Sequence, residues 1–131
     1  MKIVHSGFEV TLKDDWLAEA EMSRFVPTSK AYRVDPHWFA KDRQIRQIRI
    51  RDIAPVERHL GDYGVFRNRE SVLEILRGFR LDHAIPPVEI TSGKTTSHRY
   101  KLYNGTHRLY CSLAVGFTHV PAVPALDNWW D

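Results

Sequence analysis

The sequence predicts one α+β domain, in which a small mixed sheet packs against helices. Two observations support this prediction. Strand-like alternation and helix-like spacing follow each other along the chain, and a length of 131 residues suits a single hydrophobic core. Hydrophobic residues make up 43% of the chain and charged residues 27%, which is typical of globular domains. We expect an N-terminal strand and helix in residues 1–44, added to a core in residues 45–131.

The first forty residues are predicted to hold one strand and one helix. Residues 7–12 alternate apolar and polar side chains, as a half-buried strand does. Asp14 or Asp15 is a suitable N-cap for a helix that extends to about Met22. Two prolines interrupt the sequence after that helix, so residues 28–37 are predicted to form a loop.

The clearer patterns begin near residue 47. Residues 48–53 alternate isoleucines with charged side chains, which predicts a strand with one solvent-exposed face and a turn at its end. Asn68 can cap a helix whose apolar residues recur at i, i+3, i+4 and i+7. That spacing places them in one stripe, which consists of Val72, Ile75, Leu76 and Phe79.

The last third of the chain repeats the alternation of strands and helices. Two prolines exclude a helix and lead into a short strand at residues 88–90. The polar segment 92–97 supplies turn residues and residues 99–103 alternate again, so these strands are predicted to form a hairpin. A second helix is expected over residues 106–116, ending at a glycine, and a last strand over residues 117–123.

The strongest candidate for a binding site is the segment from Asn104 to Arg108, between a predicted strand and a predicted helix. Gly105 lets the backbone approach a ligand closely, and the helix start after it offers N–H groups and a partial positive charge to an anion. Thr106, His107 and Arg108 add side-chain donors suited to phosphate. A purely structural role fits as well, because Asn-Gly is a common turn dipeptide and Thr106 can be only a helix cap.

A resemblance to the ParB/sulfiredoxin superfamily rests on residues 100–123, which read YKLYNGTHRLYCSLAVGFTHVPAV. In that group a strand leads into a glycine-containing loop that ends in His-Arg or Arg-Arg. A helix of small residues, a glycine and a further strand follow. The upstream strand at 48–55, the helix at 71–79 and the Pro-Pro strand at 86–90 also fit, so the resemblance spans residues 45 to 125.

The resemblance implies a nucleotide ligand such as ATP, ADP or CTP, with or without magnesium. Its phosphates would lie at the Asn104 to Arg108 segment, which includes Gly105, Thr106 and His107. It also implies that Ser71 faces the nucleotide, although a Ser in a first helical turn is equally well explained by capping.

Glu57 is the candidate catalytic residue by the same resemblance. In small kinase-like members a Glu near the end of the first strand helps to activate a hydroxyl, and Glu57 lies in roughly that region. A solvated carboxylate at a helix start explains Glu57 as well. The sequence therefore leaves open whether the chain is an enzyme.

Two branches of the superfamily fit poorly. Thr106 stands where sulfiredoxins carry their nucleophilic cysteine, and a Thr hydroxyl cannot act as a thiolate at neutral pH. Cys111 lies five residues further on among apolar side chains and is expected to be a buried small hydrophobe. The helix-turn-helix and dimerisation segments of ParB partition proteins have no counterpart here, so a role in chromosome segregation is not expected.

Two classes of function remain. The first is a nucleotide-binding domain, either a nucleotide-dependent phosphotransferase, an NTPase or a switch. The second is a non-catalytic ParB-like domain that binds DNA, another nucleic acid or a protein. A net charge of +3 agrees with a phosphate-bearing partner. Arg43, Arg46, Arg49 and Arg51 could form a basic stripe for nucleic acid or simply a solvated edge, and positions 49 and 51 are predicted to share a strand face.

Composition narrows the setting of the protein. No run of eighteen apolar residues and no signal-peptide core occurs, so we expect a cytoplasmic protein without a membrane span. A single cysteine excludes an internal disulfide. The histidines show no zinc-type spacing, so no protein-bound metal is expected. Trp129 and Trp130 are predicted to pack on the core or on a partner chain.

Overall fold

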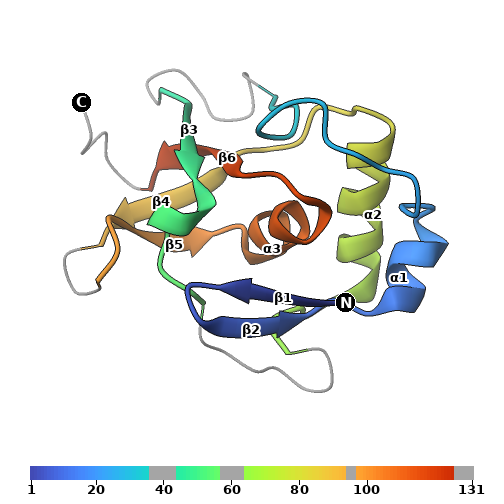
Figure 1. Ribbon diagram of the computed structural model, residues 1–131. Helices are drawn as coiled ribbons and strands as arrows, with labels where there is room; N and C mark the ends of the chain where they lie inside the picture. The colour runs from blue at the N-terminus through green and yellow to red at the C-terminus, as the bar shows by residue number, and fades with distance from the viewer. Residues whose placement is uncertain (36–43, 57–63, 94–96, 126–131) are drawn as a thin grey trace.

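The computed structural model describes residues 1–35, 44–56, 64–93 and 97–125. These residues form three α-helices and two β-sheets, which confirms the α+β class (Figure 1). Glu57, Arg43, Trp129 and Trp130 lie outside the described residues.

The larger sheet has four strands in the order β3-β6-β4-β5. Strands β4 and β6 run parallel, whereas β3 pairs with β6 and β4 with β5 in antiparallel fashion. The sheet is therefore mixed, as the sequence predicted. Its strands are β3 (Arg46–Arg49), β4 (Val88–Ser92), β5 (Tyr100–Asn104) and β6 (His119–Pro124).

The smaller sheet is a hairpin of β1 (Lys2–His5) and β2 (Phe8–Thr11). Its turn residues, Ser6 and Gly7, have φ values of 50° and 81°. Positive φ at both central positions is typical of the two-residue turns that match the twist of the flanking strands. The sequence prediction included β2 and missed β1, although the Ser-Gly dipeptide between two alternating segments is the signal for this hairpin.

Helices α2 (Arg69–Arg80) and α3 (Thr106–Val115) are confirmed close to their predicted positions. The Asn68 side chain accepts a hydrogen bond from the Ser71 backbone N–H at 3.1 Å, and the predicted apolar stripe of α2 faces the core. Helix α3 ends at Gly116, whose φ is 104°. The backbone N–H groups after that end return to the carbonyls of Leu113 and Ser112, as in a Schellman motif.

Helix α1 (Asp14–Glu19) is shorter than predicted, and neither proposed aspartate caps it. Lys13 is the N-cap residue and makes no side-chain capping bond. The Asp14 carboxylate instead accepts a hydrogen bond from the N-terminal ammonium of Met1 at 2.6 Å. The prediction was wrong because a charge that is distant in the sequence competes for this carboxylate.

The strand predicted over residues 48–53 also ends early. Strand β3 stops at Arg49, and residues Ile50–Asp52 form one turn of 3-10 helix. The sequence prediction placed Arg49 and Arg51 on one strand face. They do not share one, because Arg51 lies in the 3-10 turn. Ile50 and Ile53 are nevertheless buried, so the apolar positions were identified correctly even where the period was not.

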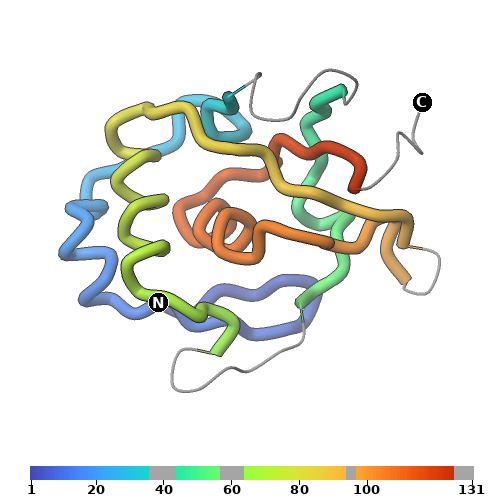
Figure 2. Tube along the Cα trace, turned by 180° about the vertical axis from the view of Figure 1, so that it is seen from behind, coloured from blue at the N-terminus to red at the C-terminus, as the bar shows by residue number. Residues whose placement is uncertain are grey.

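One hydrophobic core joins the N-terminal extension to the rest of the chain. Helix α2 lies between α1 and α3, and α3 packs against the larger sheet (Figures 1 and 2). Leu12 and Trp16 from the extension belong to the same buried cluster as Leu73 and Leu109. Residues 1–35 thus contribute to the same core as the rest of the described chain.

A buried network of hydrogen bonds connects β1 to α3. The hydroxyl of Tyr110 lies 2.9 Å from His5 Nδ1 and accepts a hydrogen bond from the Val56 N–H at 2.8 Å. His5 Nε2 lies 3.1 Å from the Ile50 carbonyl, which can only accept. His5 therefore carries its proton on Nε2 and accepts from the Tyr110 hydroxyl at Nδ1.

Candidate functional site

The Asn104 to Arg108 segment is a strand-to-helix loop, as predicted. Asn104 ends β5, Gly105 has a φ of 110°, and α3 begins at Thr106. A β-carbon at Gly105 would lie 2.8 Å from Val88 Cγ1 of the adjacent strand β4. Both the left-handed conformation and this close contact require glycine, so its presence has a structural cause independent of any ligand.

The first turn of α3 contributes no carboxylate of its own. Its N-cap is Gly105, which has no side chain to cap the helix, and its first turn contains no acidic residue. Thr106 lies within the helix, so the alternative that it is the helix cap is wrong. The partial positive charge of this helix end is thus not neutralised by its own first turn.

A cavity of about 400 Å³ brings three of the predicted site residues together. Ser71 comes from the first turn of α2, and His107 and Arg108 come from the first turn of α3. The cavity is completed by Glu74, Ile75, Gly78, His83, Ala84, Ile85 and Pro86. Asn104, Gly105 and Thr106 are not among its lining residues.

Arg108 is held by the backbone of the Pro-Pro segment. One guanidinium N–H donates to the Pro87 carbonyl at 2.7 Å, and no other hydrogen bond joins this side chain to the described residues. A guanidinium has five N–H donors in one plane, so the remaining donors of Arg108 have no acceptor in the described part of the chain. The group is fixed in place and still able to bind an anion.

Tyr32 lies beside this guanidinium. Burial raises the pKa of the Tyr32 hydroxyl, and the nearby Arg108 charge lowers it by a smaller amount. The hydroxyl donates to the Pro86 carbonyl at 2.5 Å. Tyr32 and Arg108 therefore hold consecutive carbonyls, and together they fix the wall of the cavity formed by Pro86.

His107 is also anchored by the backbone. Its Nε2 accepts a hydrogen bond from the Arg67 N–H at 2.9 Å, and its ring stacks on Phe66 with 5.9 Å between centroids. Because Nε2 is an acceptor, the neutral ring carries its proton on Nδ1, and any donation from the ring to a ligand must come from Nδ1. The contact also ties the segment before α2 to the start of α3.

The remaining predicted residues are more scattered. Asn104 is exposed and donates through its amide to a Glu89 carboxylate oxygen at 3.1 Å. Ser71 lines the cavity, and its backbone N–H donates a hydrogen bond to the side chain of Asn68. Val56, directly before the undescribed Glu57, is held by the Tyr110 hydroxyl.

Two titratable residues of the cavity escaped the sequence analysis. Glu74 lies three positions after Ser71 and therefore shares its face of α2, a spacing that could have indicated it. His83 follows the end of α2 and had no local signal, because only the fold brings it beside α3.

The described residues restrict the available chemistry. In the described ranges no group of three or more His, Cys, Asp or Glu side chains could hold a metal ion. Cys111 is fully buried, as predicted, and burial raises the pKa of its thiol, which disfavours the reactive thiolate. None of the described helices is both long and apolar enough to cross a membrane.

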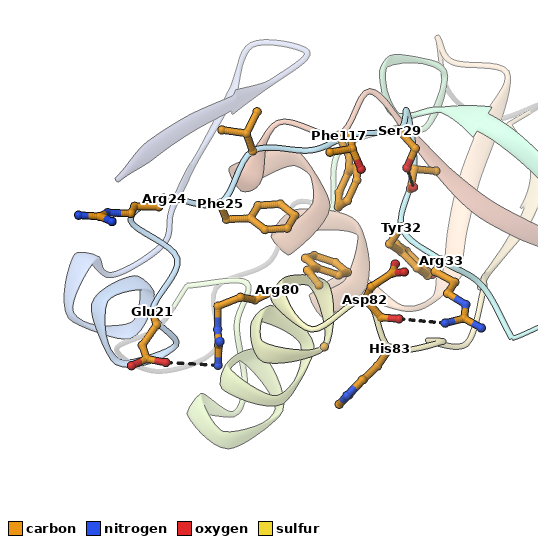
Figure 3. Close-up of a pocket in the computed structure, with 15 residues that line it drawn as sticks. Glu21, Arg24, Phe25, Ser29, Tyr32, Arg33, Arg80, Asp82, His83 and Phe117 are labelled. Carbon is orange, nitrogen blue, oxygen red and sulfur yellow. Dashed lines mark hydrogen bonds and ion pairs between the residues drawn. The ribbon is translucent and has the colours of Figure 1, made fainter.

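A second cavity of about 490 Å³ lies beside the first and shares Gly78 and His83 with it. Figure 3 shows aromatic rings inside it and charged side chains around it. Arg80 pairs with Glu21 at 3.3 Å, and Arg33 donates to the Asp82 carbonyl at 3.2 Å. These two arginines already have acceptors within the chain, unlike most N–H groups of Arg108.

Comparison with known proteins adds no family to this description. No protein-family model matches the chain, and no curated protein sequence matches it either. The chemistry of the site therefore has to be inferred from its own residues.

Proposed function

We propose that this chain binds a nucleotide through its phosphate groups, in the cavity between α2 and the start of α3. The observation that carries the proposal is that Ser71, His107 and Arg108 line one cavity. Ser71 belongs to α2 and the other two residues to α3, so only the fold brings them together. The cavity volume of about 400 Å³ is in the range of small-molecule sites.

Charge favours an anion at the α3 side of this cavity. Arg108 offers donors that no described residue uses, and the first turn of α3 lacks an acidic residue. Glu74, the one carboxylate among the described lining residues, lies on the α2 side. We propose that it supplies an oxygen ligand to a magnesium ion that accompanies the nucleotide.

Membership of the ParB/sulfiredoxin superfamily is part of the same proposal. The order β4, β5, glycine loop, α3 and β6 is the order on which the resemblance rests. This likeness supports ATP, ADP or CTP as ligands, and it supports a phosphotransferase or NTPase as the enzymatic form of the function. In that form Glu57 is the proposed catalytic base.

Calorimetry with ATP, ADP and CTP, each with and without magnesium, tests the binding. We expect saturable binding that Arg108→Ala weakens roughly 30-fold or more, the scale of lost charge-assisted hydrogen bonds. Arg99→Ala is the matched control, because Arg99 precedes β5 at the end opposite Asn104. Equal affinities for both variants, or no binding by the natural chain, would contradict the proposal.

Ser71→Ala is a second variant that tests the site without removing a hydrogen bond that stabilises the fold. The Asn68 cap bonds the Ser71 backbone, so the substitution leaves the cap intact while removing the hydroxyl from the cavity. We expect a loss of about two- to tenfold in nucleotide affinity with unchanged thermal unfolding. Release of phosphate from ATP or CTP that disappears in Glu57→Gln would establish the enzymatic form.

A further inference from the structure

A third hollow, of about 520 Å³, lies on a different side of the chain. It is formed by β1 with its turn, by the 3-10 turn after β3, and by the end of α3 with the connection to β6. These segments are far apart in the sequence, and the fold brings them together around one hollow. None of the nucleotide-site residues predicted from the sequence lines this hollow.

Positive charge gathers at this hollow. Arg49, Arg51 and His119 line it, and the side chains of the two arginines are exposed. Neither guanidinium forms a hydrogen bond or ion pair with any residue that the structure describes. In the cavity of Figure 3, two of the three arginines among the described lining residues, Arg33 and Arg80, have acceptors in the chain.

The pKa of His119 is lowered in part by the same positive charges. Burial lowers its pKa first, and then the nearby charges of Lys30 and Arg49 lower it further, while Asp52 raises it. Its Nδ1 lies 2.8 Å from the Thr118 hydroxyl, so the ring has a fixed orientation. The cations around this ring outnumber the single carboxylate among the named charges.

The floor of the hollow is apolar. Val4 is 63% exposed, an unusual position for a large aliphatic side chain on a strand, and Leu113 is half-buried. Ile50 and Phe117 also line the hollow and are buried. A bare inorganic anion would use the cations and leave this apolar surface uncovered, whereas a ligand with both phosphates and flat bases would use both.

We propose that this hollow binds single-stranded nucleic acid, with backbone phosphates on Arg49 and Arg51 and one base against the apolar floor. Duplex DNA fits less well, because its bases are stacked inside and cannot enter a concave apolar surface. The two arginines are close in sequence but come from different elements, a strand end and a 3-10 turn. This site is separate from the proposed nucleotide cavity and does not depend on it.

Fluorescence anisotropy with labelled ten-residue oligonucleotides, one of DNA and one of RNA, tests the proposal. We expect salt-dependent binding that Arg49→Gln/Arg51→Gln weakens at least about tenfold. The slope of log affinity against log salt should fall by about 1.4, since each phosphate contact to a single strand contributes about 0.7. The DNA and RNA arms show which of the two nucleic acids is the ligand.

Arg24→Gln/Arg67→Gln is the matched control, because both residues are exposed and neither lines the hollow. Val4→Ser tests the apolar floor separately, and we expect weaker binding with an unchanged salt slope. Equal losses in the two double variants, tighter binding of a duplex, or no binding of either oligonucleotide would overturn the proposal. Retention of oligonucleotide binding in Arg108→Ala, with nucleotide binding lost, would show that the two sites are distinct.

Discussion

The buried hydrogen bonds that join Val56, Tyr110 and His5 predict that removing one hydroxyl group will lower the free energy of unfolding substantially. Tyr110→Phe keeps the ring, which is fully buried, and removes only the hydroxyl. Two groups then lose their partners: the Val56 N–H, bonded at 2.8 Å, and His5 Nδ1, bonded at 2.9 Å. An unsatisfied buried polar group costs about 1–3 kcal/mol, so we expect the free energy of unfolding to fall by roughly 2–4 kcal/mol, given partial access of water to Val56.

Urea unfolding followed by circular dichroism measures this difference. Tyr103→Phe is the matched control, because Tyr103 is 57% exposed and its hydroxyl can bond water in either state. We expect that control to change stability by less than about 0.5 kcal/mol. A Tyr110→Phe effect as small as the control would refute the assignment of donors and acceptors along this chain.

Three further predictions concern single residues. Gly105→Val should destabilise the fold by roughly 3 kcal/mol or more in urea unfolding, since positive φ and the Val88 contact both oppose a branched side chain. Asp82→Gly should stabilise it by about 0.5–1 kcal/mol, because Asp82 has a φ of 55° after the end of α2; a destabilised variant would contradict this. Burial lowers the folded-state pKa of His5, so the unfolded chain binds more protons below its ordinary pKa of 6.5. Stability should therefore be full above that pH and fall as pH decreases through it, and His5→Gln should flatten the decline.

Local signals explain which parts of the fold could be predicted. Asn68, the apolar stripe of α2 and the glycine at position 116 each act within one or two helical turns, and the structure places both helices where those residues predict them. The β4–β5 hairpin followed from its turn residues in the same way. Strand β1 was missed even though its turn gave a local signal, whereas the other two failures involve distant partners. The N-terminal ammonium binds Asp14, and the Ile50 N–H at the start of the 3-10 turn donates to the Thr118 carbonyl.

In the candidate site, too, features with a local sequence signal could be predicted, and features that depend on distant packing could not. Gly105 and Arg108 were predictable because a glycine before a helix start has local geometric meaning. The acceptor role of His107 was not, because it depends on the Arg67 N–H, which only the packing of α2 against α3 brings near. The convergence of Arg49 and Arg51 on one hollow likewise depends on the turn beginning directly after Arg49, earlier than the alternation predicted.

Both proposed sites draw on α3, and this makes their independence measurable. The nucleotide cavity uses the first turn of the helix, at His107 and Arg108, whereas the nucleic-acid hollow uses Leu113 and the connection that follows. With a rise of about 1.5 Å per residue, Arg108 and Leu113 are about 8 Å apart along the axis, so neither ligand group need touch the other site. Sites separated by more than about 7–10 Å without shared partners usually give additive effects, within about 0.5 kcal/mol. We therefore expect saturating nucleotide to leave the oligonucleotide affinity within about twofold, and a larger change would mean that α3 couples the two sites.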